Sequence, residues 1–388
     1  MGAKKIAYVN SNMLHWARMQ TPFDTIEKLH DYDDKIKTED VEKWESGIDY
    51  PSISQAKLLA KYYKLPFAAF YLSAPPKNNI RKYTNRRTIS GHPERELSIS
   101  LWNEIQEFIA IRNSAVENLV DVEQNFPSLP IMDSTDSIED IGRKVRDFLD
   151  YHPPFKNKSA YKNKPFNYFR KLFEDSGILV FQMKDIEINE ARGISIYQDV
   201  LPIIGITAKD HDRAKVFSLF HELAHLILRT TESYCLVDFG ENGDEEKHCD
   251  EIAAEILLPK NTFKEVAQDV YSKYGRWDDS SIEDISNRFG VSLLSVLRRL
   301  KDTGLMDTQD YWEKFHIMVG RYNYFKREKT ETPPKIKYEY KYISRNGTLY
   351  PRIIMTAYAK GSLSYGEMCS TLNISPQNLR KLSAVLYK

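Results

Sequence analysis

The sequence predicts a multi-domain, mostly α-helical protein that contains one α+β domain with a small sheet. The 388 residues suffice for two to four domains at roughly 100 to 200 residues each. Most of the chain carries apolar residues at helical spacing, and short β-branched or aromatic runs gather in one stretch after Gly177. Two consecutive prolines, Pro75 and Pro76, cannot continue a helix and mark the first domain boundary.

The composition is typical of an ordinary globular protein. The chain has 55 Lys+Arg and 55 Asp+Glu, with 41% hydrophobic and 28% charged residues, which excludes disordered and collagen-like polypeptides. No apolar run approaches the roughly 18 residues needed to span a bilayer, so no membrane insertion is expected. The start MGAKKIAYVN lacks the apolar core of a signal peptide, and three scattered cysteines form no disulfide framework. A cytoplasmic location is therefore expected.

Charge is distributed unevenly along the chain. Residues 313–388 hold 14 basic and 5 acidic residues, a net charge of +9, whereas residues 1–76 hold 10 of each. The residues between these two segments carry −9. A basic tail region would suit a polyanion or an acidic partner surface, although a merely solvated basic face fits the same count.

The elements are predicted in order along the chain. Residues 1–76 read as a run of short helices, and residues 77–136 as a helical connector because Leu101, Ile105 and Phe108 begin an apolar stripe. In the domain at 137–310 we expect the following elements: helices 138–149 and 166–175, strands 178–183, 193–197 and 203–207, and helices 213–228 and 245–258.

The residues that follow these elements also carry helical patterns. Residues 280–305 read as two helices around a turn at Gly290, with Ser292 as N-cap of the second, a helix-turn-helix arrangement. Residues 311–388 form a basic C-terminal domain with a tyrosine-rich strand at 336–343. Two final helices, 364–372 and 375–386, make that domain α+β.

One helix carries a metal-ligand motif. His221, Glu222 and His225 match H-E-x-x-H, and positions i and i+4 lie on one helix face, so both imidazoles can reach one ion. Glu222 projects beside that site, where a carboxylate can take a proton from water activated by zinc and deliver it to the leaving amine. The alternative is an amphipathic helix with two hydrogen-bonded histidines and a solvated glutamate.

The helix at 245–258 offers the third ligand. At about 100° per residue, Ala253 and Leu257 lie within about 20° of Glu246, which places Glu246 on the inward face. We therefore predict Glu246 as the third zinc ligand. Asp250, one turn later, is expected to orient a ligating histidine, or else to be a surface acid. Cys249 points to the other side of the stripe and is expected to be a small core residue.

These motifs resemble the ImmA/IrrE family of zinc metallopeptidases, which are gluzincin-like enzymes. The resemblance rests on FSLFHELAHLIL at 217–228, on E-x-x-C-D-x-x-A-A-E-I-L-L-P at 246–259 and on the strand phrases at 191–207. It implies a zinc cofactor and cleavage of small Xre-type repressors of mobile elements or stress regulons. This chain departs from the family at Asp250, where Asn is frequent, and at Ile252, where an aromatic residue is frequent.

The N-terminal residues resemble an Xre-type helix-turn-helix domain. Residues 38–63 are similar to its later helices, and the would-be recognition helix ends at Trp44 to Gly47. That helix presents Glu39, Asp40, Glu42 and Glu45 with one lysine, so it would meet DNA phosphates mostly with like charge. DNA binding through this domain is therefore doubtful, and contact with a protein partner is the preferred interpretation.

The sequence leads to one main functional hypothesis and two alternatives. The first is a zinc-dependent endopeptidase that cleaves an Xre-type repressor, with the substrate extended along an edge strand between Gly193 and Thr207. One alternative is a DNA-binding transcriptional regulator in which the zinc fold is a sensor or scaffold. The other is an anti-repressor that sequesters its partner without cutting it.

Overall fold

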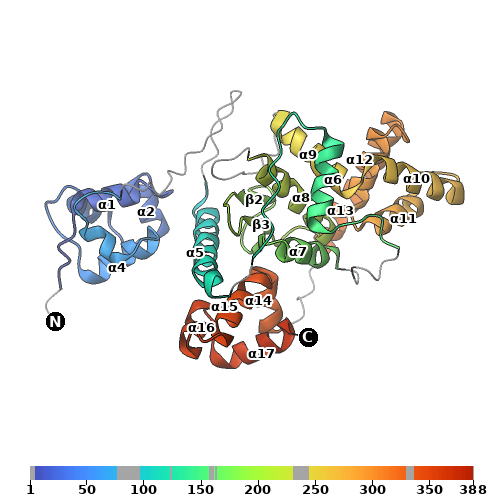
Figure 1. The fold of residues 1–388 in the computed structure, drawn as a ribbon. Helices are drawn as coiled ribbons and strands as arrows, with labels where there is room; N and C mark the ends of the chain where they lie inside the picture. The colour runs from blue at the N-terminus through green and yellow to red at the C-terminus, as the bar shows by residue number, and fades with distance from the viewer. Residues whose placement is uncertain are drawn as a thin grey trace. The chain divides into compact units, whose positions relative to one another are not determined.

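The computed structural model describes residues 5–76, 97–122, 125–156, 161, 164–229, 244–328 and 336–387. The chain divides into two compact units, Met1–Glu107 and Phe108–Lys388, and the boundary falls inside helix α5 (Ile99–Val122). Helices predominate and one three-stranded sheet accompanies them (Figure 1), as expected for a multi-domain α+β protein. None of the described helices is long and apolar enough to cross a membrane.

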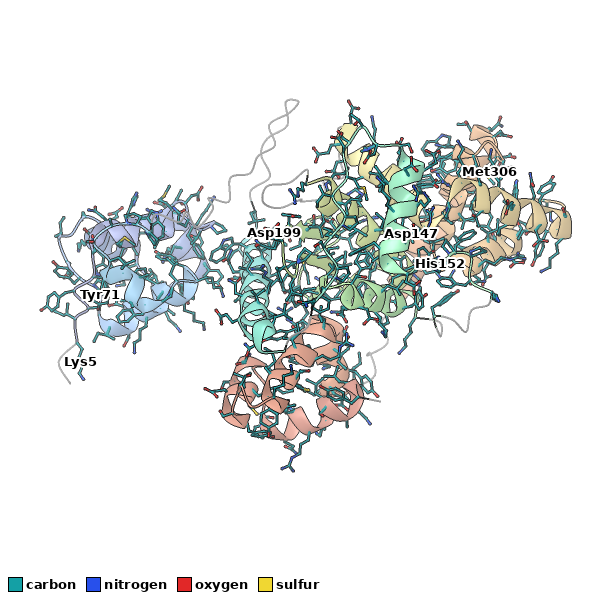
Figure 2. All side chains as sticks on the ribbon, in the orientation of Figure 1. Lys5, Tyr71, Asp147, His152, Asp199 and Met306 are labelled. Carbon is teal, nitrogen blue, oxygen red and sulfur yellow. The ribbon has the colours of Figure 1, made fainter. Side chains whose placement is uncertain are left out.

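The first unit begins with short helices, as predicted. They are α1 (Ser11–Arg18), α2 (Ile26–Tyr32), α3 (Thr38–Glu45), α4 (Ile53–Tyr62) and the 3-10 helix η1 (Phe67–Tyr71). Their apolar faces meet in one core that includes Trp44 and Phe70. Ser52 starts α4 with a capping box, because its hydroxyl accepts from the Gln55 backbone amide while the Gln55 side chain accepts from the Ser52 amide. Tyr71, at the end of η1, is labelled in Figure 2.

The sheet of the second unit has the three strands that the sequence predicts. They are β1 (Leu179–Met183), β2 (Gly193–Ile196) and β3 (Ile203–Thr207). Their order is β1-β3-β2, with β1 parallel and β2 antiparallel to the central strand β3. Every strand residue is buried, which agrees with near-continuous apolar runs rather than alternation. The region between Gly193 and Thr207, predicted to contain an edge strand, therefore contains one edge strand, β2, and the central strand, β3.

Between α5 and the C-terminal group, the described part of the second unit contains eight helices. They are α6 (Ile138–Leu149), α7 (Pro165–Asp175), α8 (Asp212–Leu228), α9 (Asp244–Leu257), α10 (Lys260–Tyr274), α11 (Asp279–Phe289), α12 (Leu293–Asp302) and α13 (Thr308–Glu328). Helix α8 packs on β2, on β3 and on α9, while α6 covers the other side of α9. Asp147 marks the last turn of α6 and His152 the segment just after it (Figure 2). The central position of α8 fixes its side chains from several sides.

The predicted helix pair at 280–305 is present as α11 and α12. Gly290 ends α11 with φ +71°, a left-handed conformation that favours glycine. Ser292 is the N-cap of α12, and its hydroxyl accepts from the Ser295 amide at 3.0 Å, as the sequence indicates. The boundaries of this helix pair are thus readable from its capping residues.

The predicted strand at 336–343 is wrong, and the described part of the C-terminal region is helical instead of α+β. Its helices are α14 (Tyr338–Asn346), α15 (Leu349–Ala359), α16 (Tyr365–Thr371) and α17 (Pro376–Leu386). The alternating tyrosines suggested a period of two, but the buried residues are Glu339, Tyr342 and Asn346, which recur with the helical period. Tertiary packing overrides the local pattern here.

A buried ion pair joins α7 to the C-terminal helices. The guanidinium group of Arg170 lies 3.2 Å from Glu174 and donates to the Ile343 carbonyl at 3.0 Å and the Ser344 carbonyl at 2.7 Å, in the last turn of α14. Glu174 accepts from the Thr348 amide, just before α15, at 3.0 Å. A cation at a helix C-terminus and an anion at a helix N-terminus both stabilise the helix ends.

Candidate metal centre

Two neighbouring helices bring the predicted metal ligands together. His221 and His225 lie one turn apart on α8, and Glu246 lies in the first turn of α9, which packs against α8. Their side chains are nearly inaccessible, with 5%, 0% and 3% of the residue surface exposed. Three polar side chains with so little access to water need partners, and a shared metal ion satisfies all three.

The distances among the ligand atoms suit one tetrahedral ion. The His221 Nε2 atom lies 3.2 Å from His225 Nε2 and 3.1 Å from Glu246 Oε2, and His225 Nε2 lies 3.5 Å from the same oxygen. Bonds of about 2.0 to 2.1 Å in a tetrahedral zinc site place ligand atoms about 3.3 Å apart. The two nitrogens and one oxygen therefore match the donor set and the spacing of a zinc site with an open fourth position.

Two members of this cluster, Glu246 and His221, have shifted pKa values. Burial raises the pKa of Glu246, but hydrogen bonds with His221 and His225 outweigh it and hold that pKa far below its usual range. Burial lowers the pKa of His221, and hydrogen bonds with Asp250 and Glu246 reverse this and raise it to about 10. A carboxylate that stays ionised is the form that binds a metal ion, whereas His221 must lose its proton to become a ligand, so metal binding at this site would release a proton.

Asp250 contacts one of the predicted ligands, His221. Its Oδ1 atom lies 3.0 Å from His221 Nδ1, so the other ring nitrogen of His221 faces the ligand cluster. Its Oδ2 atom accepts from Arg298 on α12 at 3.2 Å. A carboxylate behind a ligating histidine fixes the ring and its tautomer. Arg298, which the sequence did not single out, in turn holds Asp250.

Cys249 lies nearer the site than its predicted direction indicates. It is a fully buried core residue, but its Sγ atom lies 3.5 Å from His225 Nδ1. The prediction placed it on the far side of the α9 stripe, and the close packing of α8 on α9 nevertheless brings His225 against it. Burial raises the pKa of the Cys249 thiol, and its Sγ atom contacts Nδ1 of His225, the ring nitrogen opposite the one in the ligand cluster.

Glu222 is a buried carboxylate without a protein partner. It is 0% exposed, and neither carboxylate oxygen has a hydrogen-bond partner among the described residues. Burial raises its pKa to about 7, while His221, His225 and the Ser195 hydroxyl act in the opposite direction. An unpartnered buried acid destabilises the fold, and such groups concentrate at functional sites.

Strand β2 leaves the space that Glu222 occupies. A Cβ atom at Gly193 would lie 2.5 Å from Glu222 Oε1 and 2.7 Å from its Cγ atom, closer than real contacts allow. Ser195, two residues later on the same strand, is 0% exposed. The sequence offered one signal that went unused: a glycine inside a predicted strand marks a close approach.

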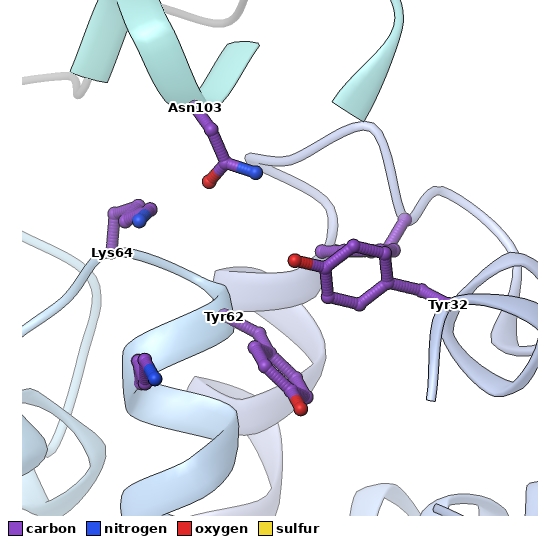
Figure 3. Close-up of a pocket in the computed structure, with 6 residues that line it drawn as sticks. Tyr32, Tyr62, Lys64 and Asn103 are labelled. Atoms are coloured by element: carbon purple, nitrogen blue, oxygen red, sulfur yellow. The ribbon is translucent and has the colours of Figure 1, made fainter. Parts of the chain in front are cut away.

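A second hollow lies in the first unit and is chemically different. Figure 3 shows this pocket, which is lined by Phe23, Tyr32, Lys61, Tyr62, Lys64 and Asn103. None of these six is a histidine, cysteine or carboxylate, so this pocket has no metal-ligand set. Within the residues that the structure describes, the cluster of three close metal-ligand side chains is His221, His225 and Glu246.

Two histidines and a glutamate around one point, beside a buried carboxylate, make up the kind of centre that metal-dependent hydrolases use. Residues 173–301 match the model of a peptidase family, M78, described as the IrrE N-terminal-like domain. The match contains α8 and α9 with all the site residues and agrees with the ImmA/IrrE resemblance over that range. No curated protein matches the chain.

Proposed function

We propose that this chain is a zinc-dependent endopeptidase. The observation that carries the proposal is the set of three ligand atoms 3.1 to 3.5 Å apart beside the partnerless carboxylate of Glu222. His221, His225 and Glu246 would hold the ion. When bound, zinc in such a site acts as a Lewis acid that activates water and polarises a carbonyl group. The peptidase family match over residues 173–301 supports the same reaction class.

Glu222 is the proposed general base and acid. Its pKa of about 7 lies near the operating pH of a cytosolic enzyme, where a carboxyl group can both accept and release a proton. Ser195 is the nearby donor that lowers the pKa of Glu222 against the larger effect of burial, but within the described residues neither carboxylate oxygen has a hydrogen bond of good geometry, so both can accept the proton of the attacking water. The same carboxyl group then delivers that proton to the amine that leaves.

The proposed substrate is an extended peptide that pairs with β2. Within the described residues, strand β2 pairs with β3 on one side and has no strand on its other edge, and it packs directly on α8. An added strand on the other edge would gain main-chain hydrogen bonds independent of its side chains. Because Gly193 begins β2 against Glu222, this edge would bring a scissile bond close to the catalytic carboxylate.

The proposed protein substrate is a small Xre-type repressor, and the first unit would recognise it. Helix α3 displays Glu39, Asp40 and Glu42 at its surface. Glu45, predicted to face outward with them, instead accepts from Arg18 through both oxygens at 2.8 Å. The remaining acidic surface suits a basic protein partner better than DNA phosphates.

Peptide cleavage by the wild type and by Glu222→Gln tests the enzyme proposal. Both proteins would be loaded with zinc and incubated with a peptide library prepared from a bacterial proteome, and new termini would be identified by mass spectrometry. We expect the wild type to create new termini and Glu222→Gln to lose about 10²- to 10⁴-fold in rate. Zinc content should be equal in both. Equal cleavage by the two proteins would exclude Glu222 as the base.

The repressor proposal has its own test. Purified, folded Xre-type repressors would be incubated with the wild type, with Glu222→Gln as control. Site-specific cutting by the wild type alone would support repressor cleavage. Cutting of library peptides without cutting of any folded repressor would retain the peptidase and reject this substrate.

The non-proteolytic alternatives are less well supported by the site. A sensor or scaffold needs a metal ion but has no use for a buried, partnerless Glu222, whose ionisation costs stability. A DNA-binding role for the pair α11 and α12 is weakened because Arg298 binds Asp250 and Arg299 binds Glu255. Both arginines of α12 are thus engaged within the protein. A zinc-loaded protein that cuts neither peptides nor repressors, yet binds a repressor tightly, would favour sequestration.

A further inference from the structure

Besides α11 and α12, the second unit contains another helix pair with a short connection, α16 and α17. Helix α16 ends at Thr371 and α17 begins at Pro376, so four residues connect them. Asn373 adopts φ +49°, the left-handed conformation that lets the chain reverse in a short turn. Helix pairs with turns of three or four residues are the form in which a second helix is presented to a DNA groove.

Two tyrosines hold this turn in place. The Tyr342 hydroxyl of α14 donates to the Leu372 carbonyl at 3.1 Å, and the Tyr350 hydroxyl of α15 donates to the Thr371 carbonyl at 2.7 Å. Burial raises the pKa of Tyr350 to about 12, so its hydroxyl remains a donor at neutral pH. The turn is therefore hydrogen-bonded to two other helices, and α17 itself packs against α14.

The outer face of α17 is polar and cationic. Gln377, Arg380, Lys381 and Ala384 are exposed and follow the helical spacing i, i+3, i+4 and i+7. Helix α17 contains no acidic residue. Over the described part of the chain, no ion pair or hydrogen bond occupies the side chains of Arg380 and Lys381.

The surroundings of α17 are also basic. Residues 336–387 contain seven lysines and arginines and only two acidic residues, Glu339 and Glu367. Glu339 is 8% exposed, and the Glu367 carboxylate accepts from the Ser364 amide in a capping box. Neither acid neutralises the cationic face. A surface of this sign attracts phosphate groups.

The other two helix pairs lack such a face. The surface of α3 in the first unit is acidic, with Glu39, Asp40 and Glu42. On α12, Arg298 and Arg299 are bound to acids of α9. Of the three helices α3, α12 and α17, α17 is the one that combines two exposed cations without an ion pair and no acidic residue.

We propose that α17 binds duplex DNA in the major groove. Arg380 and Lys381 contact the phosphate backbone, and Gln377, in the first turn, faces the base edges, where an amide pairs best with adenine. This binding site is separate from the metal centre and does not depend on peptidase activity. It would bring the enzyme to DNA on which a repressor is bound.

The test measures DNA binding by the full-length protein and by two matched double variants. The probe is a fluorescent duplex of about 25 base pairs with random sequence, titrated at several salt concentrations between about 50 and 200 mM. R380A/K381A removes two charges from α17. K57A/K61A removes two exposed charges from helix α4 of the first unit and is the control. Circular dichroism verifies that both variants remain folded.

We expect the wild type and K57A/K61A to bind alike, with an affinity that falls steeply with salt. R380A/K381A should lose on the order of tenfold in affinity at low salt, and the slope of log K against log salt should fall by about two. No binding by the wild type at low salt would overturn the proposal, and so would an equal loss of affinity in both variants. Competition by polyglutamate as strong as competition by unlabelled DNA would also overturn it. Selection from randomised duplexes should yield a preferred sequence with the wild type and a weaker preference with Gln377→Ala.

Discussion

Two buried clusters of charged side chains in the second unit differ in whether their hydrogen bonds are made. In the cluster on α7, Arg170 and Glu174 bind each other. Arg170 also donates to the carbonyl groups of Val180 and of residues 343–345, and Glu174 accepts from the amide and the hydroxyl group of Thr348. In the cluster on α8 and α9, the ligand atoms of His221, His225 and Glu246 converge on one point, and no described residue makes a hydrogen bond of good geometry with the Glu222 carboxylate.

The difference separates a structural role from a chemical one. A buried ion pair whose hydrogen bonds are all made holds two segments in register, and removing one partner exposes the other to an apolar interior. A buried carboxylate without donors costs stability, and a fold keeps it where chemistry requires it. The same residue types therefore serve different ends, and the hydrogen-bond inventory distinguishes them.

Breaking the satisfied cluster should have the largest effect on stability. Arg170→Met leaves Glu174 charged and buried, so we expect a loss of about 3 to 5 kcal/mol in the free energy of unfolding. Urea denaturation followed by circular dichroism measures it. The control is Arg143→Met, which removes an exposed ion pair with Asp140 and should cost far less. Similar losses in both variants would contradict the assigned role of Arg170.

Neutralising Glu222 should raise the free energy of unfolding instead of lowering it. Burial raises the pKa of Glu222 from 4.5 to about 7, so the folded protein binds this proton more tightly than the unfolded chain. Its contribution is most favourable below pH 4.5 and is lost as the pH rises through 7. In metal-free protein, Glu222→Gln should thus gain up to about 3 kcal/mol over the wild type above pH 7. The two should be similar near pH 4.5, and a glutamine variant less stable at pH 8 would contradict this reasoning.

Filling the space beside Glu222 should have a smaller effect on stability. It tests whether strand β2 contacts the site through Gly193. Gly193→Ala places a methyl group 2.5 Å from Glu222 Oε1, and overpacking of this kind costs about 1 to 3 kcal/mol. Peptide cleavage should fall while zinc content is kept. Gly320→Ala, whose Cβ meets nothing within 4 Å, is the control. The double variant Gly193→Ala with Glu222→Ala should regain stability, and simple additivity of the two changes would exclude the proposed contact.

The helical period explains which site features the sequence could predict. His221 and His225 share a face at any i, i+4 spacing, and the angle of Glu246 relative to Ala253 selects it over the other acids of α9. The structure places those three ligand atoms together. Gly193 and Arg298 went unnoticed because their roles depend on which strand or helix packs against α8 and α9, and tertiary packing carries that information.

The C-terminal region shows where local pattern misleads. The tyrosines between 336 and 343 alternate as in a strand, but the carbonyl groups at the end of α14 are capped by Arg170, more than 160 residues earlier. An ion pair at i, i+4 such as Arg170 with Glu174 is readable from the sequence as a surface pair on one helix. Its burial and its long-range partners are not, because they depend on the docking of α14 on the sheet.

Metal analysis of the purified protein tests the central claim most directly. The wild type, His221→Ala, Glu246→Ala and His152→Ala would be prepared with excess zinc, desalted and measured by elemental analysis. His152 is an exposed histidine outside the site and serves as the control. We predict about one zinc per chain in the wild type and the control, and much less in the two ligand variants. A zinc-free wild type, or ligand variants that keep their zinc, would contradict the assignment of this centre.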